Sequence, residues 1–123
     1  MSLRRLDFLR QIVNVILAEE NVEGKVADTV KDLVAKAELK YRFSAFGEKP
    51  ENLAKYLNSI EFEDVVKLLI GENYEKALYR ILEVTEKNYS DIEEVRLAIK
   101  RVRNKIGKIK RELSLGKGET RRK

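Results

Sequence analysis

The sequence predicts an all-α protein: a bundle of five or six helices whose last helix is long and follows a heptad pattern. Three observations lead to this prediction. Apolar residues recur at steps of three and four along most of the 123-residue chain. No segment shows the strict alternation of apolar and polar residues that is typical of a half-buried strand. With 43% apolar residues and one proline, the chain can bury a single core without disulfides.

The first half of the chain is expected to form three helices. Apolar steps of three and four indicate a first helix over about residues 3–20 and a second over about 25–44. Between them, the broken period over residues 19–24 predicts a loop. Pro50 is tolerated at a first helical position, so it begins a short third helix, whose apolar positions continue to Ile60.

Two further helices are expected before residue 90. Ser59 is a candidate N-cap for the fourth helix, which is apolar nearly all round and ends at Gly71. A helix with this composition belongs at the centre of a bundle. We expect Asn73 to open the fifth helix. Its inward positions are predicted to be Tyr74, Ala77, Leu78, Ile81 and Leu82.

The sixth helix carries the most regular pattern in the chain. Ser90 and Glu93 have the spacing of a capping box, so the helix is expected over about residues 91–114. Its apolar residues are spaced 3, 4, 3, 4, 3 and 4 apart, at Ile92, Val95, Ile99, Val102, Ile106, Ile109 and Leu113. Such a seam either joins the internal core or pairs with a second chain, as in a coiled coil. Residues 1–114 would then form one domain, with 115–123 as a flexible basic tail.

Charge is distributed unevenly between the two ends of the chain. Residues 1–95 hold 14 basic and 19 acidic side chains, a net charge of −5, whereas residues 96–123 hold 12 basic and 2 acidic ones, a net charge of +10. Helices that need only solubility usually alternate charges, because like charges three or four residues apart repel. The sixth helix therefore combines an apolar seam with a basic face.

Seven basic residues of this helix lie away from the seam and form the candidate site. They are Arg96, Lys100, Arg101, Arg103, Lys108, Lys110 and Arg111. The leading interpretation is binding to the phosphates of RNA or DNA without sequence preference. Alternatively, the face packs on an acidic surface, either of this chain or of a protein partner, or it is simply solvated. A homodimer through the seam is a further hypothesis, and a membrane partner is not expected.

The absence of histidine and cysteine removes most enzyme classes. It excludes a Ser–His–Asp triad, a cysteine nucleophile and nearly all zinc sites, so we expect no enzyme, no cofactor and no metal. The N-terminal residues do not form a signal peptide, and no run of 18 apolar residues occurs, which predicts a cytoplasmic protein. Abundant lysine and glutamate with a single methionine are typical of thermophilic proteins.

One acidic set offers an alternative enzyme site. Glu19, Glu20 and Glu23, followed by Glu61 and Asp64 in the form Glu-x-x-Asp, resemble the two halves of the magnesium-binding motif of all-α nucleotide pyrophosphohydrolases. The resemblance covers these five residues only. It implies a magnesium-dependent hydrolase, whereas the competing interpretation is a set of solvated helix ends.

Two remaining features bear on nucleic-acid binding. Residues 40–46 interleave Lys40, Tyr41, Arg42, Phe43 and Phe46, which either stack on exposed bases or dock into the core. In size, helical content and basic face, the chain resembles the small all-α subunits of RNA-guided interference complexes. This resemblance rests on fold class and carries over no site residues.

Overall fold

The computed structural model describes residues 9–41 and 50–122 and, within them, the side chains of 9–41 and 51–114. All six helices are present, and the described residues contain no strand, which confirms the all-α prediction. The helices are α1 (Leu9–Glu19), α2 (Gly24–Tyr41), α3 (Pro50–Leu57), α4 (Ile60–Gly71), α5 (Glu75–Asn88) and α6 (Glu93–Arg122). Of the region 40–46, Arg42, Phe43 and Phe46 lie outside the described residues.

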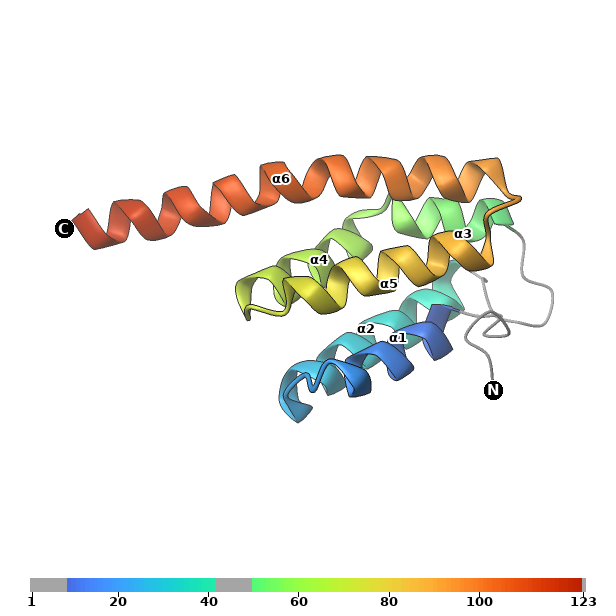
Figure 1. Cartoon of the computed structure of the whole chain (residues 1–123), viewed down its shortest axis with the longest axis horizontal. Helices are drawn as coiled ribbons and strands as arrows, with labels where there is room; N and C mark the ends of the chain where they lie inside the picture. Colours follow the sequence, from blue (N-terminus) through green and yellow to red (C-terminus); the bar gives the residue numbers. More distant parts are fainter. Residues whose placement is uncertain (1–8, 42–49, 123) are drawn as a thin grey trace.

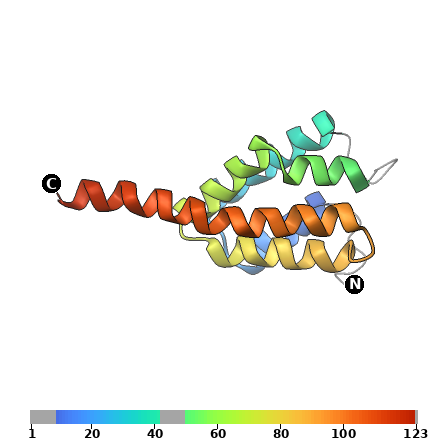
Figure 2. The same cartoon turned by 90° about the horizontal axis from the view of Figure 1, so that it is seen from above.

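The helices form three layers (Figure 1). α1 and α2 make one outer layer, α4 and α5 make the middle one, and α3 and α6 make the other outer layer. α4 packs against α2, α3, α5 and α6, so the prediction that this apolar helix is central is confirmed. The C-terminal end of α6 extends past the ends of the other helices in both views (Figures 1 and 2).

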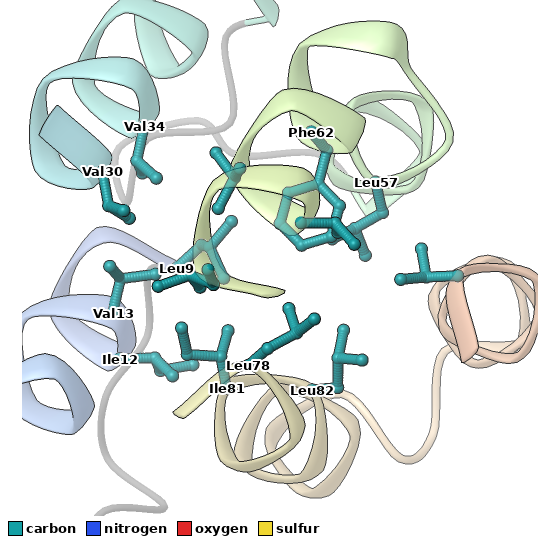
Figure 3. Close-up of a cluster of buried hydrophobic side chains, with 14 of the residues drawn as sticks. Leu9, Ile12, Val13, Val30, Val34, Leu57, Phe62, Leu78, Ile81 and Leu82 are labelled. Atoms are coloured by element: carbon teal, nitrogen blue, oxygen red, sulfur yellow. The ribbon is translucent and has the colours of Figure 1, made fainter. Parts of the chain in front are cut away.

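The core is a continuous cluster of aliphatic side chains between the layers. Figure 3 shows Ile12 and Val13 of α1 near Leu78 and Ile81 of α5, with Phe62 of α4 in the same cluster. All five are at most 1% exposed. Burial of each such side chain contributes roughly 1.5–3 kcal/mol to the stability of the fold. The buried side chains come from the apolar stripes of the helices.

Two asparagines end α1 and α4 in the same way. Asn21 and Asn73 have φ angles of 56° and 69°, in the left-handed region that asparagine tolerates better than most residues. The N–H of Tyr74 donates to the Leu69 carbonyl oxygen and that of Asn73 to the Ile70 carbonyl oxygen, which is a Schellman motif. Asn73 therefore ends α4, and the prediction that it opens α5 is wrong.

The corner between α1 and α2 repeats this arrangement and its local sequence. The N–H of Val22 donates to the Leu17 carbonyl oxygen across Asn21, as the N–H of Tyr74 does across Asn73. Both corners read Glu-Asn-x-Glu, at residues 20–23 and 72–75. Each corner joins two antiparallel helices. α1 and α2 thus form one helical hairpin, and α4 and α5 form another. The two hairpins pack together through contacts of α1 with α5 and of α2 with α4.

The predicted start of α4 is confirmed and that of α6 is not. Ser59 Oγ accepts a hydrogen bond from the N–H of Phe62, which caps α4 as expected. α6 begins at Glu93, and the Ser90 side chain makes no hydrogen bond recorded among the described residues. Ile92 instead occupies the capping position: its carbonyl oxygen accepts a hydrogen bond from the N–H of Arg96, and its half-buried side chain packs on the core.

Two more expectations differ from the structure. Ile60, expected on the apolar side of the third helix, is the first residue of α4 and is 73% exposed. α6 also continues to Arg122 rather than ending near residue 114. Glycine in a helix costs about 1 kcal/mol relative to alanine but does not end the helix as proline does, and no proline follows Pro50. The domain limit at 114 remains a prediction.

Candidate functional site

The heptad seam of α6 belongs to the internal core as far as Ile109. Val95, Ile99, Val102, Ile106 and Ile109 are all at most 4% exposed, and α6 packs on α3, α4 and α5. No second chain is needed to cover this stretch. The seam between residues 95 and 109 is therefore not available to pair with a second chain in an intermolecular coiled coil. Self-association through another surface remains a prediction.

All seven basic residues predicted as the site are exposed, but they do not have the same surroundings. Two of them pair with acids of α5. Arg103 Nη2 lies 3.1 Å from Glu86 Oε1, and Lys110 Nζ lies 2.8 Å from Glu75 Oε2. Because α5 and α6 run in opposite directions, these two pairs fasten one flank of α6 along its length.

The other flank of α6 is fastened by a residue outside the predicted set. Lys105 Nζ lies 3.8 Å from Glu63 Oε1 of α4. The interpretation that the basic face packs on the acidic body of the same chain thus holds for the flanks of α6. The side chains of these pairs are 27–47% exposed, so solvent screens the pairs and each contributes little to stability.

The ion pair with Glu75 also affects the ionisation of Lys110. The hydrogen bond and the charge of the Glu75 carboxylate raise the pKa of Lys110, and nearby Tyr79 adds to this. Tyr79 lies one helical turn from Glu75 and one turn from Glu83, on the side of α5 that faces α6. Its ring is 40% exposed.

The remaining predicted residues make up the outward face, which we define as Arg96, Lys100, Arg101, Lys108 and Arg111. All five are exposed and lie away from the buried stripe of α6. No ion pair is recorded for any of them with the residues whose side chains the structure describes. From Arg96 to Arg111 the face spans about 22 Å along the helix.

Two hollows lie side by side in the groove between α5 and α6. The first has a volume of about 310 Å³, and outward-face residues Arg96 and Lys100 line it with Leu97. The second has a volume of about 540 Å³ and contains Tyr79. Glu86 and Arg103 line both hollows, so their ion pair lies at the boundary between the two hollows.

Three of the five acidic residues of the possible hydrolase site are paired with residues outside that set. Arg80 Nη1 lies 2.6 Å from Glu19 Oε1 and 3.4 Å from Glu20 Oε2, which joins α5 to the end of α1. Lys40 and Tyr41 each donate a hydrogen bond to the carboxylate of Glu61. Among the described residues, no group of three or more carboxylates is placed to hold a metal ion.

Tyr41 docks into the protein rather than standing free for base stacking. Its hydroxyl donates to Glu61 Oε1 at 2.8 Å, and its ring centroid lies 5.7 Å from that of buried Tyr56. Hydrogen bonds from Lys40 and Tyr41 lower the pKa of Glu61 to about 2. Burial raises the pKa of Tyr56 well above its ordinary value.

Besides Lys105 and Glu63, three residues that matter for the site were not predicted from the sequence. Glu75 and Glu86 neutralise two of the predicted cations, and Tyr79 faces the groove between them. Their spacing on α5, at residues 75, 79 and 86, places them on one helical face. Nothing in the sequence indicates that α6 lies along this face.

Comparison with protein-family models, with curated proteins and with solved structures finds no match for this chain. None of the helices described is both long enough and apolar enough to cross a membrane.

Proposed function

We propose that this protein binds nucleic acid without enzymatic activity, through the phosphates, using the outward face of α6. The basic residues of that face release counterions when they contact phosphates, which drives binding that does not depend on base sequence. Arg103 and Lys110 flank this face and supply less, because the chain's own acids already neutralise them.

The observation that carries the proposal is that, among the described side chains, no ion pair is recorded for the five cations of the outward face, although Glu93 and Glu112 lie within one turn of two of them. Like charges three or four residues apart, such as Arg96 with Lys100, destabilise a helix by about 0.2–0.5 kcal/mol each. The flanks of the same helix show that this chain can place glutamates against its cations. A polyanion that neutralises the outward face accounts for the difference between the two sets.

The test is fluorescence-anisotropy binding to labelled single-stranded RNA, single-stranded DNA and duplex DNA over a salt series. The variant to compare with the wild type is Lys100→Gln, Arg101→Gln and Lys108→Gln combined. If each residue contacts one phosphate, the log–log salt slope on a single strand falls by about 2, at roughly 0.7 per phosphate. The thermal stability of this variant should be equal to or higher than that of the wild type, because repulsion between like charges on α6 is relieved.

A matched control changes the same number of charges elsewhere. Lys25, Lys31 and Lys36 are exposed on α2, in the layer farthest from α6 (Figure 1). Their combined change to glutamine should leave both affinity and salt slope within error of the wild type. An equal loss in both variants would show that only net charge matters, and no binding by the wild type at low salt would overturn the proposal.

A further inference from the structure

The groove between α5 and α6 has a chemistry different from that of the outward face. The second hollow, of about 540 Å³, is lined by Tyr79, Glu83, Glu86, Lys87, Ser90 and Arg103. Two carboxylates balance two cations there. A phosphate gains little from such a neutral surface, whereas an aromatic ring beside hydrogen-bonding groups suits a flat, polar, uncharged group.

From this we infer that the hollow holds an unpaired nucleobase stacked on Tyr79, so that the ligand of this protein is a single-stranded nucleic acid. The inference rests on the proposed function and specifies its ligand. In a duplex the base faces are covered by stacking on their neighbours, so a base can reach a ring in a groove only from a single strand or a flipped nucleotide.

The first argument is the exposure and setting of Tyr79. Tyr79 is 40% exposed, and its position on α5 lies between Glu75, which pairs with Lys110, and Glu86, which pairs with Arg103. The buried stripe of α6, which packs on α3, α4 and α5, holds the two helices in place, so the hollow is preformed. No hydrogen bond to the Tyr79 hydroxyl is recorded among the described residues, and the core does not need this ring.

The second argument is continuity with the phosphate-binding surface. The first hollow, of about 310 Å³, is lined by outward-face residues Arg96 and Lys100, by Glu93, and by Leu97, which is 46% exposed. It meets the second hollow at the Arg103–Glu86 pair. A single-stranded nucleic acid whose phosphates contact Arg96 and Lys100 can therefore place one base past Arg103 and against the ring of Tyr79.

The third argument is the polar lining around the ring. The carboxylates of Glu83 and Glu86 can accept hydrogen bonds from the amino groups of a base, as acidic side chains do from cytosine. Arg103 and Glu86 are each about 40% exposed, so their pair is weak and Arg103 can turn to a phosphate at small cost. The same carboxylates repel phosphates and keep the backbone on α6.

The experiment compares two single-stranded DNA oligomers of equal length, one normal and one with abasic sites throughout. Both carry the same phosphates, and only the first carries bases. Wild-type protein should bind the normal strand about 10-fold more tightly than the abasic strand, within the range found for one stacked base. Tyr79→Ala should bind both strands with the affinity that the wild type has for the abasic one.

Tyr79→Phe serves as the matched variant, because it keeps the ring and should keep the wild-type preference for bases. The fluorescence of 2-aminopurine placed in the strand should be quenched by the wild type and by Tyr79→Phe, and not by Tyr79→Ala. Equal binding of normal and abasic strands by the wild type overturns the inference and leaves the proposed function standing. Tighter binding of duplex than of single strand also overturns it, and no binding to either strand refutes the proposed function itself.

Discussion

The hydroxyl oxygen of Tyr74 accepts a hydrogen bond from the backbone N–H of Glu23, with 3.1 Å between the two atoms. The two residues are 51 positions apart in the chain and belong to the two Glu-Asn-x-Glu corners. Each corner ends one helix and leads into the next. This hydrogen bond therefore joins the turn of the α1–α2 hairpin to the turn of the α4–α5 hairpin.

We expect Tyr74→Phe to destabilise the protein by about 1 kcal/mol, because the ring stays in place and one hydrogen bond to a backbone donor is lost. Urea unfolding followed by circular dichroism measures the change in the free energy of unfolding. Tyr79→Phe is the control and should change it by less than about 0.5 kcal/mol, since surface substitutions away from such contacts have small effects. Equal effects of the two substitutions would show that the contact between the corners is not stabilising.

Two substitutions of Asn73, the residue with a left-handed backbone at the second corner, are expected to change stability in different ways. Asn73→Ala should cost about 1 kcal/mol, because alanine is strained at a φ of 69°, and Asn73→Gly should be neutral or stabilising. The midpoints of thermal unfolding measure both. If alanine were tolerated as well as glycine, the Schellman motif would contribute nothing to stability.

Thr85 is completely buried in α5, and its Oγ1 has no hydrogen-bond partner within the part of the chain that the structure describes. An unpartnered buried hydroxyl costs about 1–3 kcal/mol, so Thr85→Val should raise the free energy of unfolding by about 1 kcal/mol. Thr85→Ala removes the same hydroxyl and a methyl group, and should be less stable than Thr85→Val. A destabilised valine variant would indicate that the hydroxyl is paired in solution.

Glu61 gives the fold a defined sensitivity to acid. Hydrogen bonds from Lys40 and Tyr41 lower its pKa from 4.5 to about 2 in the folded state. The unfolded chain therefore binds this proton first, and the stability that Glu61 contributes is complete above about pH 5 and is lost as the pH falls toward 2. The midpoint of thermal unfolding should fall over this window.

The comparison that isolates this effect is with Glu61→Gln. The glutamine variant should be less stable than the wild type at pH 7, and the gap between the two should narrow steadily from pH 5 to pH 2.5. A gap that stays constant with pH would show that the Glu61 carboxylate keeps an ordinary pKa.

Local patterns in the sequence were sufficient for most of the fold. The period of apolar residues located the helices, and Ser59 marked the start of α4, because both depend only on neighbours within a turn or two. The start of α6 could not be found in this way. Ile92 is placed by packing against the core, and this contact overrides the capping box that Ser90 and Glu93 suggest locally.

The sequence also gave no basis for separating the cations of the last helix. Arg103 and Arg101 look alike in the sequence, yet Arg103 is neutralised by Glu86, while no ion pair of Arg101 is recorded among the described side chains. The difference depends on which flank of α6 lies against α5. The heptad pattern fixes the buried stripe of a helix, but it does not identify the helices that cover that stripe.

The sequence by itself determined that the chain is helical, that α6 carries a buried stripe and that positive charge gathers on its other sides. These properties follow from spacing and composition, which act within a few residues. Only the tertiary structure decided that the stripe is internal and that Glu75, Glu86 and Glu63 neutralise the flanks. It also placed Tyr79 in the same hollow as Arg103 of α6. Contacts between residues distant in the chain depend on how helices pack, and helices with the same apolar period can pack in several orders.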